Sequence, residues 1–247
     1  MKKIEIIAEI GQNHNGDMKL AFELIQEAKR MGADVAKFQL YDAKALFPKE
    51  NNPWYEYNCQ TELSMSQLEA LKAECDRVGI EFMASVFDTA RVDWLEELGV
   101  KRYKIASRSI YDTNLIARLS QTQKDLIVSL GYWKEKEFPK ILTKAKVLFL
   151  YCVSEYPTPL QAVHLDKVDF TRYAGFSDHT ISLTASMAAL ARGAKILERH
   201  LTLDKTMFGP DHALSMTPGD LKVLSNYRDE LEIILGLETT TQPTVKS

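Results

Sequence analysis

A short pattern recurs along the chain and constrains the fold more than any other feature. An amphipathic stretch is followed by a glycine, then an apolar residue, then a run of strand-forming residues. A glycine directly after a helix adopts the left-handed backbone conformation without the steric penalty of a Cβ. The order helix, glycine, strand is what consecutive βα units require, and it predicts an α/β fold with parallel strands. The pattern occurs at Met31-Gly32-Ala33, Val78-Gly79-Ile80, Leu98-Gly99-Val100 and Arg192-Gly193-Ala194.

Eight nearly continuous apolar runs fit such strands, because parallel strands are covered on both faces. Eight βα units in 247 residues predict a single (β/α)8 TIM barrel over residues 1–237, followed by a polar C-terminal tail over 238–247. An open doubly wound sheet is the alternative, but no Gly-x-Gly-x-x-Gly or P-loop follows any strand. The predicted strands span residues 4–10, 35–40, 81–85, 102–105, 125–129, 147–152, 174–178 and 196–201.

Three other segments carry local predictions. The longest connection, residues 41–64, is rich in Tyr, Asn, Pro and acidic residues, and we expect it to form a lid or substrate loop. The last helix is predicted to begin at Thr217-Pro218, an N-cap followed by proline at the first helical position. Asn13-His14-Asn15-Gly16-Asp17 is typical of a turn that leads into a helix.

The composition argues against several classes of protein. A net charge of -3, from 31 basic and 34 acidic residues, provides no strong attraction to nucleic acid or to an anionic membrane. No apolar run approaches the ~18 residues that span a bilayer, and the N-terminal stretch resembles no signal peptide. Cys59, Cys75 and Cys152 form no close-spaced pair, so buried or neutral thiols and a cytoplasmic location are expected.

All eight predicted strands carry polar side chains at or near their carboxyl ends. In a barrel these ends meet on one face, where catalytic residues lie. Polar groups at such positions are costly unless they are paired, so their presence on every strand predicts one shared site. The residues are Glu9, Lys37, Gln39, Ser85, Asp88, Lys104, Ser107, Ser129, Ser154, Tyr156, Ser177, Asp178, His179, Glu198 and His200.

Lys37 and Lys104 lie in apolar strand contexts, which leaves three interpretations open. A lysine there can pair with a buried acid such as Glu9, can form a Schiff base, or can hold an anion. Serine hydroxyls on several strands favour the anion site, with a phosphate and a carboxylate as the bound groups.

His179 and His200 end neighbouring strands, so their imidazoles can converge. A pair of histidines with Glu9 and Asp211 nearby suits a divalent metal whose shell is completed by carboxylate or water. A histidine at a strand end can also be a hydrogen-bonded core residue, and this alternative stays open for each one alone.

Together these segments resemble the sialic acid synthase family, in order and over nearly the whole chain. The opening residues of the family match Ala8-Glu9-Ile10-Gly11-x-Asn13-His14-Asn15-Gly16-Asp17, and Gly32-Ala33-Asp34-x-x-Lys37-Phe38-Gln39 matches the next segment. The later matches are Tyr103-Lys104-Ile105-x-Ser107, Tyr156-Pro157-Thr158-Pro159, Gly175-Phe176-Ser177-Asp178-His179-Thr180, Glu198-x-His200-x-Thr202-Leu203-Asp204-Lys205 and Gly209-Pro210-Asp211-His212.

The resemblance implies an enzyme that condenses phosphoenolpyruvate with the open-chain aldehyde of an N-acetylhexosamine, giving a 3-deoxy-2-keto sugar acid and phosphate. It implies that His179 and His200 hold Mn²⁺ or Mg²⁺, and that Glu9 lies close to the reacting carbons and the metal. Gln39, Tyr156 and Asp211 would face the sugar. Phosphoenolpyruvate would be surrounded by Lys37, Ser85, Lys104, Ser107, Ser129, Ser154 and Ser177.

These roles fit the chemistry of the reaction. The metal can act as a Lewis acid on the aldehyde oxygen. Glu9 can stabilise positive charge at C2 of phosphoenolpyruvate or help to deliver water there. Glu9, Lys37, Lys104 and His179 are therefore the expected catalytic residues.

The sequence departs from the family pattern mainly on the sugar side. After the fourth strand the family's Gly-Ser-Gly-Glu is Ala106-Ser107-Arg108-Ser109, so a sugar-contacting acid is lost and an arginine is added. Ser154 replaces an asparagine. The family's small C-terminal antifreeze-like domain, which supplies an arginine to the partner in a dimer, is expected to be absent. We therefore expect a retained reaction and a different aldehyde, with Arg108 holding an acidic group on it or forming a loop salt bridge.

Two other functions are compatible with the sequence. One is a synthase of the 3-deoxyoctulosonate or heptulosonate type, which uses a phosphosugar acceptor. The other is a catalytically silent barrel that acts as a binding subunit, although such a protein has no chemical need for both lysines and both histidines. A homodimer is implied by the resemblance alone.

Overall fold

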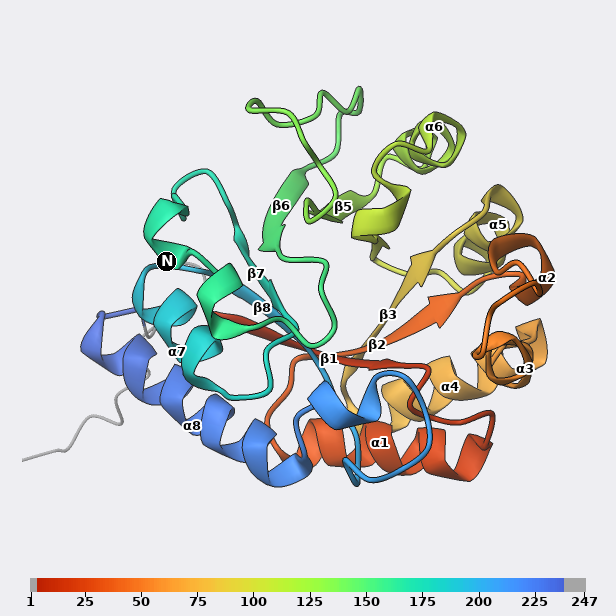
Figure 1. Ribbon diagram of the computed structural model, residues 1–247, viewed down its shortest axis with the longest axis horizontal. Helices are drawn as coiled ribbons and strands as arrows, with labels where there is room; N and C mark the ends of the chain where they lie inside the picture. Colours follow the sequence, from red (N-terminus) through yellow and green to blue (C-terminus); the bar gives the residue numbers. More distant parts are fainter. Residues whose placement is uncertain (1–3, 238–247) are drawn as a thin grey trace, which may run out of the picture.

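Eight parallel strands close into a barrel in the computed structural model, which describes residues 4–237. The strands follow one another around the barrel in sequence order, and the helices lie outside them (Figure 1). The (β/α)8 prediction is confirmed, and each strand lies within one residue of its predicted bounds. The predicted tail, residues 238–247, lies outside the described residues. The strands are β1 Glu5–Gly11, β2 Val35–Leu40, β3 Glu81–Val86, β4 Arg102–Ile105, β5 Asp125–Ser129, β6 Val147–Cys152, β7 Gly175–Asp178 and β8 Ile196–His200.

The helices form where amphipathic patterns and capping residues coincide. Asp17 accepts a hydrogen bond from the Lys19 N–H at the start of the first main helix, so the predicted turn does lead into a helix. Thr217 and Asp220 form a capping box with Pro218 at the first helical position of the last one. The helices are α1 Met18–Arg30, α2 Ala43–Leu46, α3 Tyr55–Gln60, α4 Met65–Val78, α5 Thr89–Glu97, α6 Thr113–Gln121, α7 Thr184–Ala191 and α8 Pro218–Ile234.

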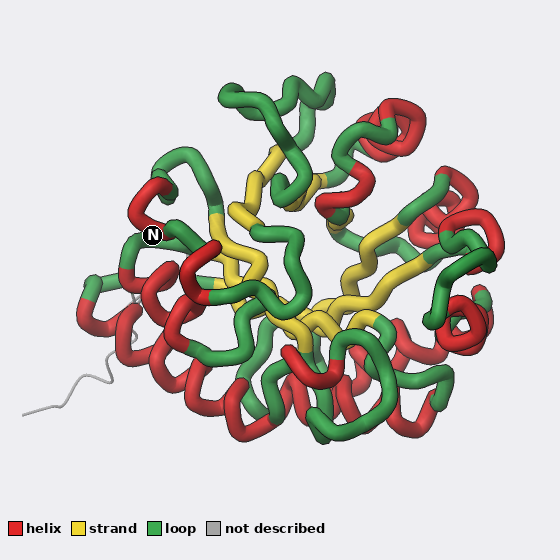
Figure 2. The backbone as a smooth tube through the Cα atoms, viewed as in Figure 1, coloured by secondary structure: helices red, strands yellow, loops and turns green. Residues whose placement is uncertain are grey.

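Two connections depart from the regular βα alternation. Residues 130–146, between β5 and β6, form no α-helix (Figure 2), and β6 leads to β7 through the short 3₁₀ turns Leu160–Ala162 and Leu165–Lys167. The side chain of Phe138 covers this part of the barrel instead, 4.8 Å from the Phe149 ring and 4.7 Å from the Tyr173 ring. The predicted long connection 41–64 differs in the other direction, because it contains α2 and α3 beside the end of β2.

The barrel interior is filled in layers, because every second residue of a strand points inward. At the amino end, Arg102 forms ion pairs with Glu5 at 2.6 Å and Glu81 at 2.7 Å. The next layer is apolar and consists of Ile7, Val35, Met83, Ile127, Leu150 and Ile196. Gly175 lies beside this layer, where a Cβ would overlap the carbonyl oxygen of Ile196. A larger apolar core fills the space between strands and helices.

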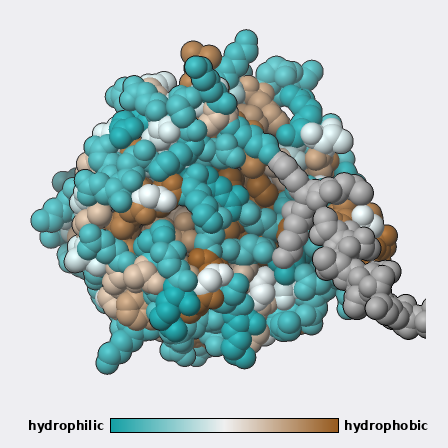
Figure 3. All heavy atoms as spheres, turned by 180° about the vertical axis from the view of Figure 1, so that it is seen from behind, coloured by the Kyte–Doolittle hydropathy of each residue, from teal (hydrophilic) through white to brown (hydrophobic). Residues whose placement is uncertain are grey.

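The outer surface carries no large continuous apolar face in the view of Figure 3, where hydrophobic side chains form small separate groups among hydrophilic ones. Among residues 4–237, no helix has the length and apolar character needed to cross a membrane.

Candidate active site

Most of the polar residues predicted from the strand ends lie above the apolar layer of the barrel. Two do not join the site, because Asp88 caps α5 and Asp178 points away from the interior and pairs with Arg199. Glu9, Lys37 and Glu198 each follow a residue of the apolar layer by two positions along the strand. Those residues are Ile7, Val35 and Ile196. The same step of two residues places Ser85, Ser129, Cys152 and Ser177 on the inner face. Side chains from all eight strands or the residues after them thus line one narrow cavity of about 60 Å³.

Lys37 lies at the centre of one half of this cavity. Its Nζ is 2.8 Å from Glu9 Oε2 and 3.3 Å from Glu198 Oε2, and it donates a 3.0 Å hydrogen bond to Ser85 Oγ. Burial works against the charged form, but Glu198 and Glu9 together raise the pKa of Lys37. The pairing with Glu9, one of the interpretations that the sequence left open, is therefore present, and the lysine is held as an ammonium group.

Lys104 occupies the other half. Its Nζ donates to Ser129 Oγ at 2.8 Å and lies 3.5 Å from Glu198 Oε1. Burial lowers the pKa of Lys104, and the nearby charge of Lys37 acts in the same direction. The side-chain nitrogens of Lys37 and Lys104 thus share the carboxylate of Glu198, which lies between them.

Glu198 is a site residue to which the sequence assigned no role. It is buried and also accepts a 2.9 Å hydrogen bond from Ser177 Oγ. Burial opposes its ionisation, but Lys104 and Lys37 hold the pKa of the carboxyl below its usual range. The available signal was its spacing: Glu198 and His200 are two residues apart on one strand, so both face inward.

The serines differ in which hydroxyl protons remain available. Ser85 and Ser129 accept hydrogen bonds from the lysines, and Ser107 accepts from the Tyr132 N–H at 2.7 Å, so each can still donate to a bound anion. Ser177 donates to Glu198, and Ser154 donates to Ser107 at 3.2 Å. Three of the five predicted serines therefore have a free O–H donor at the cavity.

Gly131 explains how Ser154 and Ser107 come together. A Cβ at this position would overlap Ser154 Oγ and would lie 3.0 Å from Ser107 Oγ. The absence of a side chain after β5 thus opens the space in which the hydroxyls after β4 and β6 meet.

His179 and His200 converge as predicted, with ring centroids 5.7 Å apart. His179 Nδ1 lies 3.1 Å from the carbonyl oxygen of Val153, which can only accept, so Nε2 carries the lone pair. Burial, with a smaller contribution from His200, lowers the pKa of His179 to about 3. His200 Nδ1 is buried without a hydrogen-bond partner, 3.7 Å from Asp211 Oδ2.

This donor set fits a divalent cation with two imidazole ligands. The neutral ring of His179 offers the Nε2 lone pair, and the orphaned Nδ1 of His200 is the kind of buried polar atom that a ligand would satisfy. Within the described part of the chain, no three His, Cys, Asp or Glu side chains are grouped closely enough to hold a metal ion by themselves. Water or substrate oxygens would have to complete the coordination.

A second, wider cavity of about 1090 Å³ adjoins the first. The two cavities share Gln39, Phe87, Ala106, Ser107, Tyr156 and His200, so a ligand in one can contact a ligand in the other. All four residues predicted for the sugar side line the wide cavity: Gln39, Tyr156, Asp211 and Arg108. Gln39 Nε2 also donates to Glu9 Oε1 at 2.9 Å, which links the two cavities.

The connection 41–64 forms one wall of the wide cavity. Gln12 Nε2 lies 2.6 Å from Tyr41 Oη and 2.9 Å from Asn58 Oδ1, and all three side chains are buried. Phe47, Asn52 and Trp54 of the same segment line the cavity. The predicted substrate loop therefore reaches the site, anchored by a buried hydrogen-bond network.

The cysteines form no disulfide among the described residues. Cys152 lines the narrow cavity, where burial raises the pKa of its thiol to about 11. Cys75 is a buried residue of α4, and burial raises the pKa of its thiol to about 12. Both therefore have the neutral thiol form expected from the sequence.

Known proteins resemble this chain over nearly its full length. Residues 24–240 match the model of the NeuB family. N,N'-diacetyllegionaminic acid synthase of Legionella pneumophila is 36% identical, over 94% of this chain and 73% of its own length. N-acetylneuraminate-9-phosphate synthase of Homo sapiens is 35% identical, over 95% and 72%. The crystal structure of the sialic acid synthetase from Leptospira borgpetersenii, in complex with citrate, gives a TM-score of 0.90 at 30% identity and covers 99% of this chain and 88% of that chain.

Proposed function

The chain belongs to the NeuB family, and from this membership we propose that it is a phosphoenolpyruvate-dependent synthase that joins phosphoenolpyruvate to the open-chain aldehyde of a sugar. The products would be a 3-deoxy-2-keto sugar acid of the sialic acid type and inorganic phosphate. The observation that carries the proposal is the narrow cavity, where Lys37 and Lys104 lie among serine hydroxyls beside a cavity wide enough for a sugar.

Phosphoenolpyruvate suits the narrow cavity because its phosphate and carboxylate need cationic and hydroxyl donors. Two ammonium groups and the free hydroxyl protons of Ser85, Ser107 and Ser129 supply them. Holding both ends of the substrate leaves its C3 facing the residues shared with the wide cavity, in the geometry that the reaction needs.

A divalent metal, Mn²⁺ or Mg²⁺, is part of the proposal for a reason of charge. Lys37 and Lys104 are balanced by Glu9 and Glu198, so phosphoenolpyruvate would bring negative charge that the cluster does not offset. His179 and His200 would hold the metal, which supplies that compensation and polarises the aldehyde oxygen as a Lewis acid.

The chain's own residues would act as follows. C3 of phosphoenolpyruvate bonds to the aldehyde carbon, positive charge develops at C2, and the aldehyde oxygen takes up the proton that is released by the water adding to C2. Glu9, held by Lys37 and Gln39, stabilises that charge and orients the water that adds to C2. The bond between C2 and the phosphate ester oxygen then breaks, the new C2 hydroxyl becomes the keto group as its proton passes to the leaving phosphate, and Lys37 and Lys104 donate hydrogen bonds to that phosphate.

The experiment that tests this function measures phosphate release from phosphoenolpyruvate against a panel of aldehyde sugars, with Mn²⁺ present, and identifies the product by mass spectrometry. A product with the mass of acceptor plus pyruvate supports the proposal. Absence of phosphate release with every acceptor, from a protein that is folded and binds Mn²⁺, would overturn it. The homodimer and the cytoplasmic location stay predictions from the sequence.

A further inference from the structure

Arg108 lies in the wide cavity without the loop salt bridge that its sequence context allowed. It belongs to the short 3₁₀ turn Ser107–Ser109 after β4, is exposed, and forms no ion pair with another described residue. Its guanidinium lies over the Phe47 ring at 5.2 Å and over the Phe87 ring at 5.9 Å. These rings hold the charge at the cavity wall, where it remains available to a ligand.

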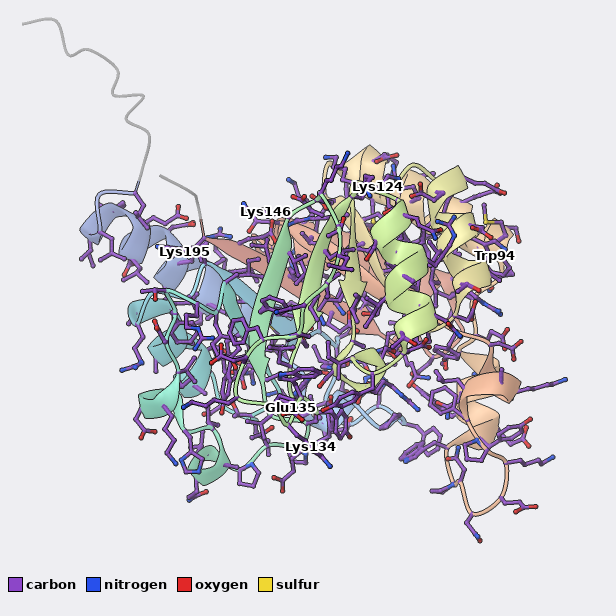
Figure 4. All side chains as sticks on the ribbon, turned by 90° about the horizontal axis from the view of Figure 1, so that it is seen from above. Trp94, Lys124, Lys134, Glu135, Lys146 and Lys195 are labelled. Carbon is purple, nitrogen blue, oxygen red and sulfur yellow. The ribbon has the colours of Figure 1, made fainter. Side chains whose placement is uncertain are left out.

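A second cation, Lys134, also lines the wide cavity. Its backbone N–H donates to Tyr111 Oη at 3.1 Å, and the Tyr111 ring is stacked on Trp133 at 5.3 Å. Lys134 thus lies at the carboxyl end of the barrel, opposite the end where Lys124, Lys146 and Lys195 precede their strands (Figure 4).

The cavity is polarised across the barrel mouth. Arg108 and Lys134 follow β4 and β5, whereas His200 and Asp211 belong to β8 and the loop after it. In a closed ring of eight strands, β4 and β8 lie on opposite sides. Among the described residues, Asp211 is the only acidic one that lines this cavity, and it lies on the side of the opening across from Arg108 and Lys134.

We propose that the acceptor sugar carries an anionic group, a phosphate or a carboxylate, and that Arg108 with Lys134 binds this group. The inference rests on the proposed function. A sugar whose aldehyde faces the narrow cavity extends into the wide one, where these two cations lie. A guanidinium binds phosphate or carboxylate through two parallel hydrogen bonds, and the aromatic rings beneath it keep it at the cavity wall.

The test measures dissociation constants by isothermal titration calorimetry for three probes: an N-acetylhexosamine, its 6-phosphate ester and the corresponding hexuronic acid. The phosphate and uronate arms identify which anion is preferred. Wild-type protein should bind an anionic probe at least tenfold more tightly than the neutral sugar, and Arg108→Gln should remove most of that preference. Lys134→Gln should reduce it by a smaller factor.

Arg172→Gln is the matched control. Arg172 also lies over a phenylalanine ring, Phe138 at 4.7 Å, but it pairs with Glu137 and does not line the cavity. This variant should keep the wild-type preference. Equal affinity of wild-type protein for neutral and anionic probes, or an equal loss for both in Arg108→Gln, would overturn the inference.

Phosphate release with the same probes separates the two proposals. If an anionic probe binds in the Arg108-dependent manner but no probe releases phosphate, the anion subsite stands and the proposed reaction is wrong. If the neutral sugar releases phosphate as efficiently as the anionic ones in both wild-type and Arg108→Gln protein, the reaction stands and the subsite is wrong.

Discussion

Arg199 and Asp178 form a fully buried ion pair between β7 and β8, with Nη1 2.5 Å from Oδ2. The two residues are directly paired in the strand register and point away from the barrel interior. The residues that follow them, His179 and His200, point into it. Arg199 also donates to the carbonyl oxygens of Thr180 and Ile181, and Ser186 donates to Asp178. The pair therefore fixes the strand ends that position both histidines.

Arg199→Met should reduce the free energy of unfolding by about 3–5 kcal/mol, because it leaves the Asp178 carboxylate buried and unpaired. Urea denaturation followed by circular dichroism measures this change. The double variant Arg199→Met with Asp178→Leu should recover part of the loss. Arg118→Met, which removes the exposed pair with Asp93, should cost no more than about 1 kcal/mol. A loss for Arg199→Met as small as this control would contradict the assigned role.

Lys104→Ala should nearly abolish the use of phosphoenolpyruvate. We expect kcat/KM for phosphoenolpyruvate to decrease about a hundredfold or more. The variant removes an ammonium group that donates to Ser129 and leaves Glu198 with one fewer counter-charge. Phosphate release gives kcat/KM, and thermal shift gives binding of phosphoenolpyruvate alone. Lys146→Ala, at the opposite end of the barrel (Figure 4), should leave both unchanged. Wild-type binding of phosphoenolpyruvate by Lys104→Ala would count against the anion site.

Removal of metal should stop turnover, and His200→Ala should lose metal binding together with activity. EDTA treatment followed by addition of Mn²⁺ tests the first statement in wild-type protein. Calorimetric titration with Mn²⁺ tests the second without reference to catalysis. The control is the variant His164→Ala. His164 lies on the β6–β7 connection, has a left-handed backbone conformation and lines neither cavity. Full turnover of His200→Ala in the presence of EDTA would refute the metal assignment.

His14 should make the fold sensitive to acid. Burial lowers the pKa of His14 to about 4, so the folded protein keeps the ring neutral while the unfolded chain takes up a proton near pH 6.5. Stability is therefore lost as the pH falls from 6.5 towards 4, by up to about 3 kcal/mol from this group. His14→Gln should show a shallower decrease in the free energy of unfolding over this range.

Urea titrations of both proteins at pH 7, 5.5 and 4.5 measure the difference, and the slope rather than the absolute stability is the readout. The Gly16 N–H donates to His14 Nδ1, and the substitution itself can change stability at every pH. Identical pH slopes for the two proteins would show that the pKa of His14 does not differ between the folded and unfolded states.

The strands were predictable because each depends on local information. A glycine after each of several helices and a nearly continuous apolar run mark where a parallel strand begins and ends. The connection from β5 to β6 was not predictable in the same way, since Trp133, Phe138 and Ile141 pack on the core from a segment that forms no α-helix. Contacts of the segment's own Phe138 with Phe149 and Tyr173 cover the barrel where eight regular βα units would place a helix.

For the site, most of the side chains that the sequence placed at the strand ends do line the cavities, because the period of two along a strand decides what points inward. By the same period Asp178 points outward, and Asp88 caps α5. It did not reveal the place of Glu198 between two lysines. That position depends on β2, β4 and β8 facing one another across a closed barrel. Glu198 and Lys104, which meet there, are more than 90 residues apart along the chain. The resemblance to the family assigned no role to Glu198, whose contacts are with residues far away in the sequence.

The sequence by itself determined the family, the eight-stranded barrel and the set of polar residues at its carboxyl end, since these follow from motifs and from periodicity along each strand. Only the tertiary structure decided how those residues divide the charge. Barrel closure balances Lys37 and Lys104 against Glu9 and Glu198, and it leaves Arg108 on two phenylalanine rings at the wide cavity. Electrostatic interactions depend on distance in space, and strand periodicity carries no information about distances across the barrel.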